Sequence, residues 1–366
     1  MTHRERCLSA LNRKQPDKVP IIEFAIDKPI IRKLAKLLGI SQGTNNKDDK
    51  SCGEMLETSQ GSEYVELYCD VLEKIDLDAI CYPFSLGLKE ISQKKAKDKY
   101  GRIFNLSVYG EPLPAEPRVR NLSDAEKFNM ASKLEPEDFS DLRLIVKRFG
   151  RNRAYFMPLT DPYKISWRTI GGMEHLLLNF RLNPKLVNRL IRISTDFILK
   201  AIDIAVDIGI DAFIMNGDFA GETGLLFSLK DYREFFKSVH IEIVEHVHQK
   251  GAMIVKHSDG NFWDLLDDWI EVGFDGIHPI QPQCMDIKKT KDYVNGKMAI
   301  LGNIDCRNLL VFGSKEEVKR NVKETIEKAA PGGGYLISSS NSIHTGCKPE
   351  NYIAMIEAAH KYGVYS

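Results

Sequence analysis

Residues 252–280 read AMIVKHSDGNFWDLLDDWIEVGFDGIHPI, and this stretch decides the class of fold. Two short runs rich in apolar and β-branched residues, 252–256 and 274–280, flank a segment, 262–272, whose apolar residues recur at helical spacing. Gly273 follows the last periodic residue, which is where helices commonly end. A helix between two buried strands predicts a parallel crossover, so the sequence favours an α/β fold.

The same alternation continues on both sides of this unit. Further strands are predicted at 18–25, 78–84, 154–159, 211–216, 298–301 and 334–338, and further helices at 184–207, 230–249, 314–329 and 349–361. Eight strands that alternate with helices favour a closed (β/α)₈ TIM barrel over an open sheet. A chain of 366 residues accommodates one such barrel with an N-terminal extension, so we expect a single domain over residues 1–366.

Two segments interrupt the alternation. Residues 40–62 are polar and rich in Gly, Ser, Asn and Lys, which is typical of a mobile surface insertion. Residues 88–120 contain the run YGRIFNLSVYGEP, which predicts an inserted hairpin followed by a Pro-rich linker.

The composition excludes several classes of function. Hydrophobic residues make up 43% of the chain and charged residues 28%, which suits a folded globular protein. The 51 Lys and Arg balance 51 Asp and Glu, so the net charge provides no field for binding nucleic acid or a membrane surface. Seven scattered cysteines do not suit a disulfide framework, and the N-terminus lacks the apolar core of a secretory signal. We therefore expect a cytoplasmic protein.

Polar side chains gather where the predicted strands end. In a parallel barrel the loops after the strands converge on one mouth, so side chains from distant parts of the sequence are expected to meet there. The candidates for proton transfer or for orienting a ligand are Asp218, Glu222 and Asp259. The candidates for substrate binding are Glu23, Asp161, Gln281, Asn303 and Asn341.

Four of the predicted strands also contain or precede side chains of the types that commonly bind zinc. These are His257, His278, Cys306 and Cys347, and zinc takes three or four His, Cys or carboxylate ligands, with one position open in catalytic sites. No CxxC or HExxH motif accompanies them, so the spacing leaves a second interpretation open. In that interpretation the cysteines are small buried hydrophobes, and His257 orients Asp259 without any metal.

Five segments, taken in order, give the chain a family resemblance. They are MTHRERCLSALNRKQPDKVP (1–20), DKYGRIFNLSVYG (98–110), KHSDGNFWDLLDDWIEVGFDGIHPIQP (256–282), LGNIDCRNLL (301–310) and PGGGYLISSSNSIHTGCKPENY (331–352). As an ordered set they resemble the uroporphyrinogen decarboxylase superfamily over nearly the whole length. The resemblance implies a (β/α)₈ barrel, in agreement with the pattern of strands and helices.

One departure separates the chain from the true decarboxylases of this superfamily. Those enzymes carry an arginine-containing RQAGR segment after the first strand, which holds the carboxylates of the substrate. Here the same place reads IIEFAIDKPIIRK, with Glu23 and Asp27. A substrate bearing eight carboxylates would meet acid where it needs guanidinium groups. The chain looks more like the corrinoid-dependent methyltransferase branch.

The resemblance to that branch implies a zinc site. Methylcobalamin:coenzyme M methyltransferases carry a His-x-Cys motif and a second cysteine near the C-terminus; here the motif reads His257-Ser258-Asp259, and Cys347 matches the second cysteine. The methyltransferase components of O-demethylase systems use an acidic residue and two later cysteines, which are similar to His278, Cys306 and Cys347. The implied ligands are thus Cys347 and Cys306 first, then His278, then His257.

The function implied is a zinc-dependent methyltransferase of a corrinoid system. It would move a methyl group between a small methoxylated or methylated compound, or a thiol acceptor, and the corrinoid. The chain contains no DxHxxG segment to hold the lower cobalt ligand, so the corrinoid is expected on a separate protein. The main alternative is a metal-free decarboxylase that acts on a different substrate through Asp259 or Asp218. A binding module without catalysis is the third, and the dense polar mouth argues against it.

Overall fold

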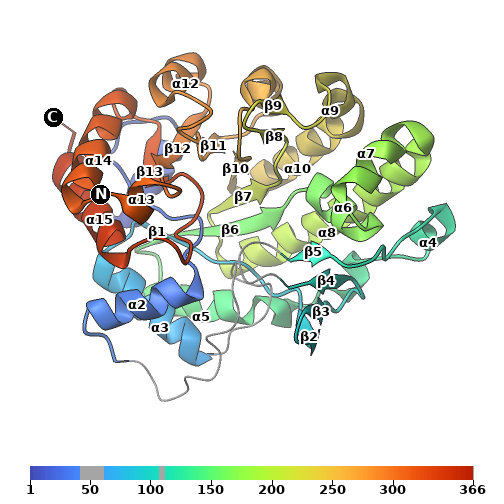
Figure 1. Cartoon of the computed structure of the whole chain (residues 1–366). Coiled ribbons are helices and arrows are strands. Elements are labelled where there is room, and N and C mark those ends of the chain that lie inside the picture. The colour runs from blue at the N-terminus through green and yellow to red at the C-terminus, as the bar shows by residue number, and fades with distance from the viewer. Residues whose placement is uncertain (42–61, 107–111, 366) are drawn as a thin grey trace.

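The computed structural model describes residues 1–41, 62–106 and 112–365, and its centre is a curled parallel sheet (Figure 1). The seven strands follow the order β1-β6-β7-β10-β11-β12-β13, and neighbours in this order are parallel. Their bounds are β1 (Ala79–Cys81), β6 (Ala154–Thr160), β7 (Ala212–Asn216), β10 (Met253–His257), β11 (Gly276–His278), β12 (Ala299–Ile304) and β13 (Tyr335–Ser339). Each lies at a position that the sequence predicts.

The segment from Pro20 to Ile22 lies between β13 and β1 and closes the ring. Ile337 donates its N–H to the carbonyl of Pro20 (2.9 Å), and Asp78 donates its N–H to the carbonyl of Ile21 (2.9 Å). The (β/α)₈ barrel is thus confirmed, although isolated bridges replace the continuous first strand that the sequence predicts. Pro20 has no N–H, and the N–H of Ile21 donates to the Asp78 carboxylate (2.8 Å). Neither residue therefore donates a hydrogen bond to a neighbouring strand.

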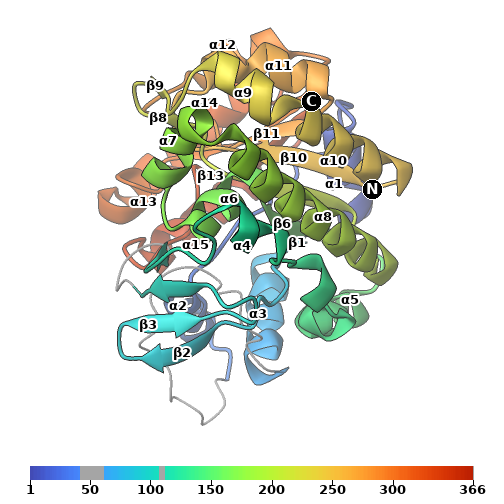
Figure 2. The ribbon, with the colours of Figure 1, turned by 90° about the vertical axis from the view of Figure 1, so that its right-hand side faces the viewer.

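Helices cover the outside of the barrel (Figures 1 and 2). The N-terminal ones are α1 (His3–Leu11), α2 (Lys28–Leu37), α3 (Ser62–Ile75), α4 (Leu122–Glu126), α5 (Ser140–Phe149), α6 (Pro162–Ile170) and α7 (Met173–Leu182). The later ones are α8 (Pro184–Ile208), α9 (Leu229–Phe235), α10 (Lys237–Gln249), α11 (Leu266–Val272), α12 (Ile287–Val294), α13 (Leu309–Phe312), α14 (Lys315–Ala329) and α15 (Pro349–Tyr362). The predicted helix over 230–249 divides at Phe236 into α9 and α10.

Apolar side chains fill the interior of the barrel. The inward-facing cluster comprises Ile22, Ala79, Cys81, Ala154, Phe156, Ala212, Ile214, Val255, Ala299, Leu301 and Leu336. These residues alternate along each strand with residues that face the helices, as the pleat of a strand requires. Cys7, Ala10 and Leu11 of α1 join the same cluster, so α1 packs under the barrel and covers its N-terminal end.

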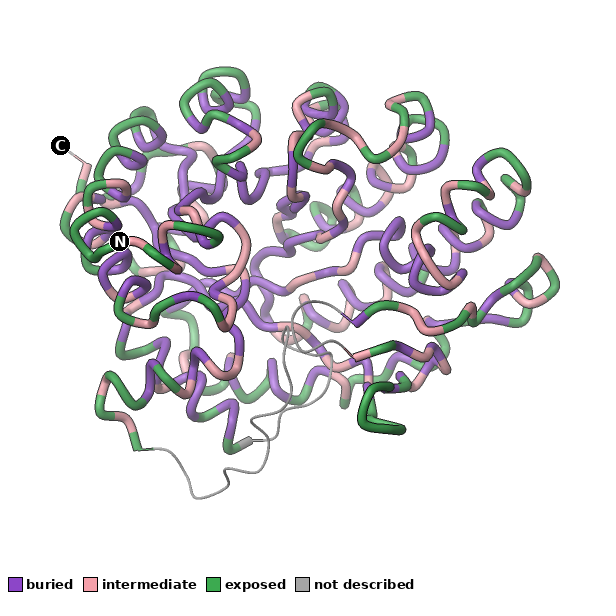
Figure 3. The backbone as a smooth tube through the Cα atoms, viewed as in Figure 1, coloured by how far each residue is buried: buried purple, intermediate pink, exposed green. Residues whose placement is uncertain are grey.

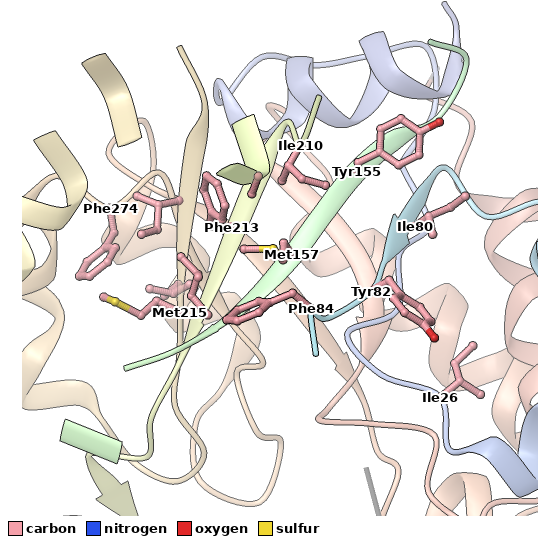
Figure 4. Close-up of a cluster of buried hydrophobic side chains, with 14 of the residues drawn as sticks. Ile26, Ile80, Tyr82, Phe84, Tyr155, Met157, Ile210, Phe213, Met215 and Phe274 are labelled. Atoms are coloured by element: carbon pink, nitrogen blue, oxygen red, sulfur yellow. The ribbon is translucent and has the colours of Figure 1, made fainter. Parts of the chain in front are cut away.

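The opposite faces of the strands pack against the surrounding helices. Figure 4 shows this outer layer, with Tyr155 and Met157 of β6 beside Phe213 and Met215 of β7. Figure 3 shows the consequence, in which the strands of the barrel are buried and the outward turns of the helices are exposed. A sheet buried on both faces explains why the strands read as nearly continuous apolar runs.

An antiparallel sheet is inserted between β1 and β6 (Figure 2). Its strands are β2 (Lys89–Ser92), β3 (Lys95–Lys97), β4 (Ile103–Asn105) and β5 (Leu113–Pro114), which is more than the single hairpin expected over 88–120. Nearly all of the polar insertion predicted at 40–62 lies outside the described residues. Among the helices that the structure describes, none has the length and apolar character to cross a membrane.

The interior cluster makes a direct prediction about stability. Replacing Phe156, which is fully buried inside the barrel, with Ala should lower the free energy of unfolding by about 3–5 kcal/mol, because a large cavity remains. Urea denaturation measures this change. Leu182 is 77% exposed at the end of α7, and its replacement by Ala should change stability by less than about 0.5 kcal/mol. Equal losses in the two variants would contradict the assignment of the core.

Candidate active site

The register of the parallel strands places four polar residues in one row at the mouth of the barrel. Thr160 of β6 pairs with Asn216 of β7, Asn216 pairs with His257 of β10, and His257 pairs with His278 of β11. Partners in adjacent parallel strands project to the same face of a sheet. The row therefore forms the floor from which the functional loops rise, as expected for a barrel of this kind.

A cavity of about 490 Å³ opens above this row. Its apolar wall includes Phe24, Phe84, Leu86, Phe104, Leu159, Ile165, Phe197 and Ile198. Its ionisable lining comprises Asp27, Asp218, His257, Asp259 and His344, together with the cations Arg102, Lys164 and Arg168. A pocket of this size, mostly apolar and with a few convergent polar groups, suits a small organic molecule.

Asp218, His257 and Asp259 form the acidic end of the cavity. One ligand atom from each lies within 4.8 Å of the others, and Nε2 of His257 is 3.7 Å from Oδ1 of Asp218 and 3.8 Å from Oδ1 of Asp259. The N–H of Asp259 donates to Asp218 (3.0 Å), and Asn341 donates to the other oxygen of Asp259 (2.7 Å). Two carboxylates and one imidazole facing a cavity are a donor set that can hold a divalent cation.

Gly260 shapes the loop that carries Asp259. Its φ of +83° favours glycine, and a Cβ at this position would lie 2.4 Å from the carbonyl oxygen of Gly221. Gln281 accepts the N–H of Gly260 (2.9 Å) and does not line the cavity. We expected Gln281 to bind substrate, but in the structure it anchors this loop. Asn303 acts similarly, because its side chain donates to the carbonyl of Ile280 (2.9 Å).

His257 and His278 lie together, although only His257 lines the cavity. Their Nδ1 atoms are 2.7 Å apart, and the ring of Phe24 stacks on His257 with 4.7 Å between centroids. Burial, and then the neighbouring His257, hold the pKa of His278 well below its usual value, so this ring is neutral. One nitrogen therefore donates to the other, and the pair couples the tautomer of His257 to that of His278.

Lys256 forms a buried ion pair beneath the row. Its ammonium donates to Asp161 (2.8 Å), and also to the carbonyls of Gly217 and His257 (3.2 Å each). Neither Lys256 nor Asp161 has any exposed surface. Burial alone would raise the pKa of Asp161, but Lys256 and His240 lower it to about 2. We expected Asp161 to bind substrate; it is instead a buried partner that holds the ends of β7 and β10.

The two candidate thiols lie together, and neither belongs to the group of possible ligands around His257. Cys347 Sγ is 3.6 Å from the carbonyl oxygen of Cys306, and Ser340 donates to Cys306 Sγ (3.4 Å). Burial raises the pKa of Cys306 to about 11 and that of Cys347 further, so both are protonated at neutral pH. Within the described residues, the only group of three or more candidate ligands at close range is the one around His257. The four predicted ligands are therefore not brought together.

Besides Asp161, two more of the predicted carboxylates lie outside the cavity. Glu222 is exposed at the rim and forms an ion pair with Arg307 (2.6 Å), so it is not placed for proton transfer inside. Glu23 is buried and accepts hydrogen bonds from the hydroxyl (2.6 Å) and the N–H (3.2 Å) of Ser339. Burial outweighs these bonds and raises the pKa of Glu23 to about 8.

Several lining residues escaped the sequence analysis. The most important are the cations Lys164 and Arg168 on α6 and Arg102 between β3 and β4. Lys164 and Arg168 are four residues apart just after a strand end, a signal that could have been found. Nothing local marks Arg102, which reaches the cavity through the inserted sheet.

Comparison with known proteins identifies relatives of two kinds. Residues 59–362 match the family model described as uroporphyrinogen decarboxylase (URO-D). The uroporphyrinogen decarboxylase of Thioalkalivibrio sulfidiphilus is 22% identical over 50% of this chain and 50% of the relative. A methylated-thiol–coenzyme M methyltransferase of Methanosarcina mazei is 21% identical over 58% of this chain and 54% of the relative. The chain thus spans about half the length of these curated relatives.

A solved structure matches over a longer range. It is described as a methyltransferase from Methanosarcina mazei, with a TM-score of 0.73 and 17% sequence identity over 99% of each chain. At this level of identity the likeness shows that the two proteins share a fold.

The ion pair below the site can be tested by removing one partner. Lys256→Met should lower the free energy of unfolding by about 3–5 kcal/mol, because Asp161 becomes a buried charge without its ammonium partner. Urea denaturation measures the loss. The double variant with Asp161→Asn should recover part of it, since the uncompensated charge is gone. A loss of less than about 1 kcal/mol in the single variant would contradict this role.

Glu23 predicts a pH dependence of stability. Its pKa is about 8 in the folded chain against an ordinary value of 4.5, so unfolding releases a proton between these values. The contribution of protonated Glu23 to the free energy of unfolding is fully present below pH 4.5 and is lost as the pH rises through 8. Glu23→Gln should therefore become more stable than wild type as the pH rises, by up to about 4 kcal/mol at pH 8. Chemical denaturation from pH 5 to 8 measures the difference, and a constant difference would contradict the protonated state.

Proposed function

Because the chain belongs to the uroporphyrinogen decarboxylase (URO-D) family, we propose that it is a zinc-dependent methyltransferase of a corrinoid system. The observation that carries the proposal is the group of Asp218, His257 and Asp259 at the end of a cavity sized for a small molecule. It would act in the cytoplasm on a methoxylated or methylated compound or on a thiol acceptor.

The donor set fits zinc. An imidazole nitrogen and two carboxylate oxygens are ligands that zinc accepts, and the adjoining cavity leaves access for a substrate atom. If Nε2 of His257 binds the ion, its proton lies on Nδ1, which then donates to Nδ1 of His278. His278 thereby becomes a positioning residue and not a ligand. When bound, zinc supplies a Lewis acid that stabilises negative charge on an ether oxygen or a thiol sulfur.

The residues around this group keep it in place. Asn341 fixes the orientation of Asp259, and the carboxylate of Asp218 holds the same loop by accepting the backbone N–H of Asp259. Phe24 covers one face of His257, and Phe84 and other apolar side chains line the same cavity. A rigid, partly desolvated arrangement strengthens every electrostatic contact that the substrate makes there.

We propose that a separate protein carries the methyl group. A corrinoid borne by that partner would supply or accept the methyl group at the mouth of the barrel. Support comes from two relatives named as methyltransferases, one of which is named for methylated thiols and coenzyme M. The small-molecule substrate would then reach the acidic group from the cavity, and the partner protein would approach it from the rim.

A second candidate is decarboxylation without metal, with Asp259 or Asp218 stabilising a protonated intermediate. The curated relatives named uroporphyrinogen decarboxylase favour it. A porphyrinogen is not the substrate we expect, because Glu23 and Asp27 occupy the segment in which the true decarboxylases carry arginines, although Arg102, Lys164 and Arg168 line the cavity from other elements. Carbon dioxide release by zinc-free protein in the absence of corrinoid would select this candidate.

Zinc analysis tests the first proposal and its ligands. The purified chain should hold about one equivalent of zinc, and Asp259→Ala should weaken zinc affinity by at least about tenfold, because a ligand is lost. Competition with a chelator measures affinity, and methyl transfer from a methoxylated compound to a Co(I) corrinoid should fall with it.

Matched variants sharpen this test. Glu222→Gln removes a carboxylate at the rim and should leave zinc affinity unchanged, and Cys347→Ser should do the same. If the cysteine variant loses zinc while Asp259→Ala keeps it, the cysteines are the ligands. Wild-type protein with less than about a tenth of an equivalent of zinc would contradict a metal-dependent function.

A further inference from the structure

The side chain of Asn216 lies in the floor of the cavity and leaves part of its hydrogen-bonding capacity open. Asn216 ends β7 and belongs to the row that also contains Thr160, His257 and His278. It lines the cavity, and its buried carboxamide oxygen has no hydrogen-bond partner among the residues that the structure describes. A buried polar atom without a partner is costly and rare in native proteins, so this atom calls for an explanation.

The layer of side chains beneath Asn216 cannot supply the missing partner. Two residues earlier along the same strands, and therefore on the same face, Pro158 pairs with Ile214, and Ile214 pairs with Val255. None of these three has a hydrogen-bonding side chain, and Ile214 and Val255 belong to the apolar interior of the barrel. A partner for the carboxamide must therefore come from the cavity side.

Other polar side chains that line the cavity already have partners within the protein. Asn341 donates to Asp259 (2.7 Å), and Nε2 of His344 lies 2.9 Å from the carbonyl oxygen of Cys306. These contacts hold the loops of the mouth in place. The carboxamide of Asn216 differs from them, because it belongs to the rigid end of a strand and is left for a ligand.

Thr160 lies on one side of Asn216, and His257 lies on the other. Thr160 ends β6, lines the cavity and pairs with Asn216, which pairs in turn with His257. Neighbouring strands are about 4.8 Å apart, so the carboxamide lies roughly one strand spacing from the imidazole. A carboxamide and a hydroxyl can each donate and accept hydrogen bonds. Together they suit a ligand group that does both, next to the reacting end of the cavity.

The charges nearby favour a neutral group at this position. Asp218 and Asp259 line the same cavity and lie near Nε2 of His257, at 3.7 and 3.8 Å. Neither Asn216 nor Thr160 brings a positive charge that would hold an anion beside these carboxylates. A hydroxyl group therefore fits this part of the floor better than a carboxylate does.

We propose that Asn216 and Thr160 form a hydroxyl-binding subsite, so that the substrate carries a neutral hydroxyl group close to its methyl-bearing atom. The inference rests on the proposed function for the reaction, and it adds the class of substrate. The carboxamide of Asn216 exchanges a hydrogen bond with the hydroxyl group, and Thr160 makes the second one. These contacts position the methyl-bearing atom beside His257 and Asp259, about one strand away.

Three matched cyclic ethers test the subsite without requiring methyl transfer. In trans-2-methoxycyclohexanol the hydroxyl neighbours the methoxy group, in trans-1-methoxy-2-methylcyclohexane a methyl group replaces it, and in trans-4-methoxycyclohexanol it lies across the ring. The first probe should bind about 5- to 20-fold more tightly than either of the others, because it alone gives the carboxamide a partner. Isothermal titration calorimetry on the full chain, without and with added zinc, measures the three affinities.

Variants assign the preference to these residues. Asn216→Leu keeps the size of the side chain but removes the carboxamide, so the preference for the first probe should fall to about twofold or less. Thr160→Val should lower it in part, and Thr160→Ser should keep it because the hydroxyl remains. Asn295→Leu changes an exposed asparagine at the end of α12 and should have no effect. Thermal unfolding checks that each variant is folded.

The outcomes separate this inference from the proposed function. If the first probe binds no more tightly than its methyl analogue, or if folded Asn216→Leu keeps the preference, the subsite is wrong even when the protein holds zinc. Equal binding of the two alcohols would overturn the placement of the hydroxyl beside the reacting atom. A preference that Asn216→Leu removes and Asn295→Leu retains supports the subsite even when no zinc binds or no methyl group is transferred. Should Asn216→Leu fail to fold, an unchanged preference in Thr160→Val would overturn the subsite, and a reduced one would support it.

Discussion

The ammonium of Lys256 is the group on which the arrangement of the mouth depends. Parallel strands end with backbone carbonyls that face a barrel's mouth, and a buried carbonyl needs a donor. Lys256 donates to the carbonyl of Gly217, which follows β7, and to the carbonyl of His257, which ends β10. Asp161 balances the charge of Lys256. Asp218 follows one of these carbonyls directly, so the positions of Asp218 and His257 are set together.

This arrangement also constrains the backbone nearby. A Cβ on residue 217 would lie 2.5 Å from Cβ of Asp161, so a glycine is needed for the strand end to approach the ion pair. The carboxylate of Asp161 also accepts the N–H of Tyr163 and so caps α6. The helix that carries Lys164 and Arg168 is thereby attached to the same buried pair that positions the acidic group. One interaction thus links both polar regions of the cavity.

The separation of these two regions gives the cavity a direction. Carboxylates and an imidazole at one end can hold a cation, and guanidinium and ammonium groups elsewhere attract an anion. The two sets of groups give one cavity ionisable side chains of both signs.

The sequence by itself determined the barrel and the level of the site within it. Apolar runs of strand length separated by helical periodicity allow few folds, and in a parallel barrel the strand ends must share one mouth. The tertiary structure decided which possible metal ligands lie close together, because this depends on the direction of each side chain. His257 points into the cavity, whereas Cys306, Cys347 and Asp161 at similar strand ends are buried beside it or beneath it. The same holds for Arg102, which reaches the cavity from an inserted sheet whose position no local pattern specifies.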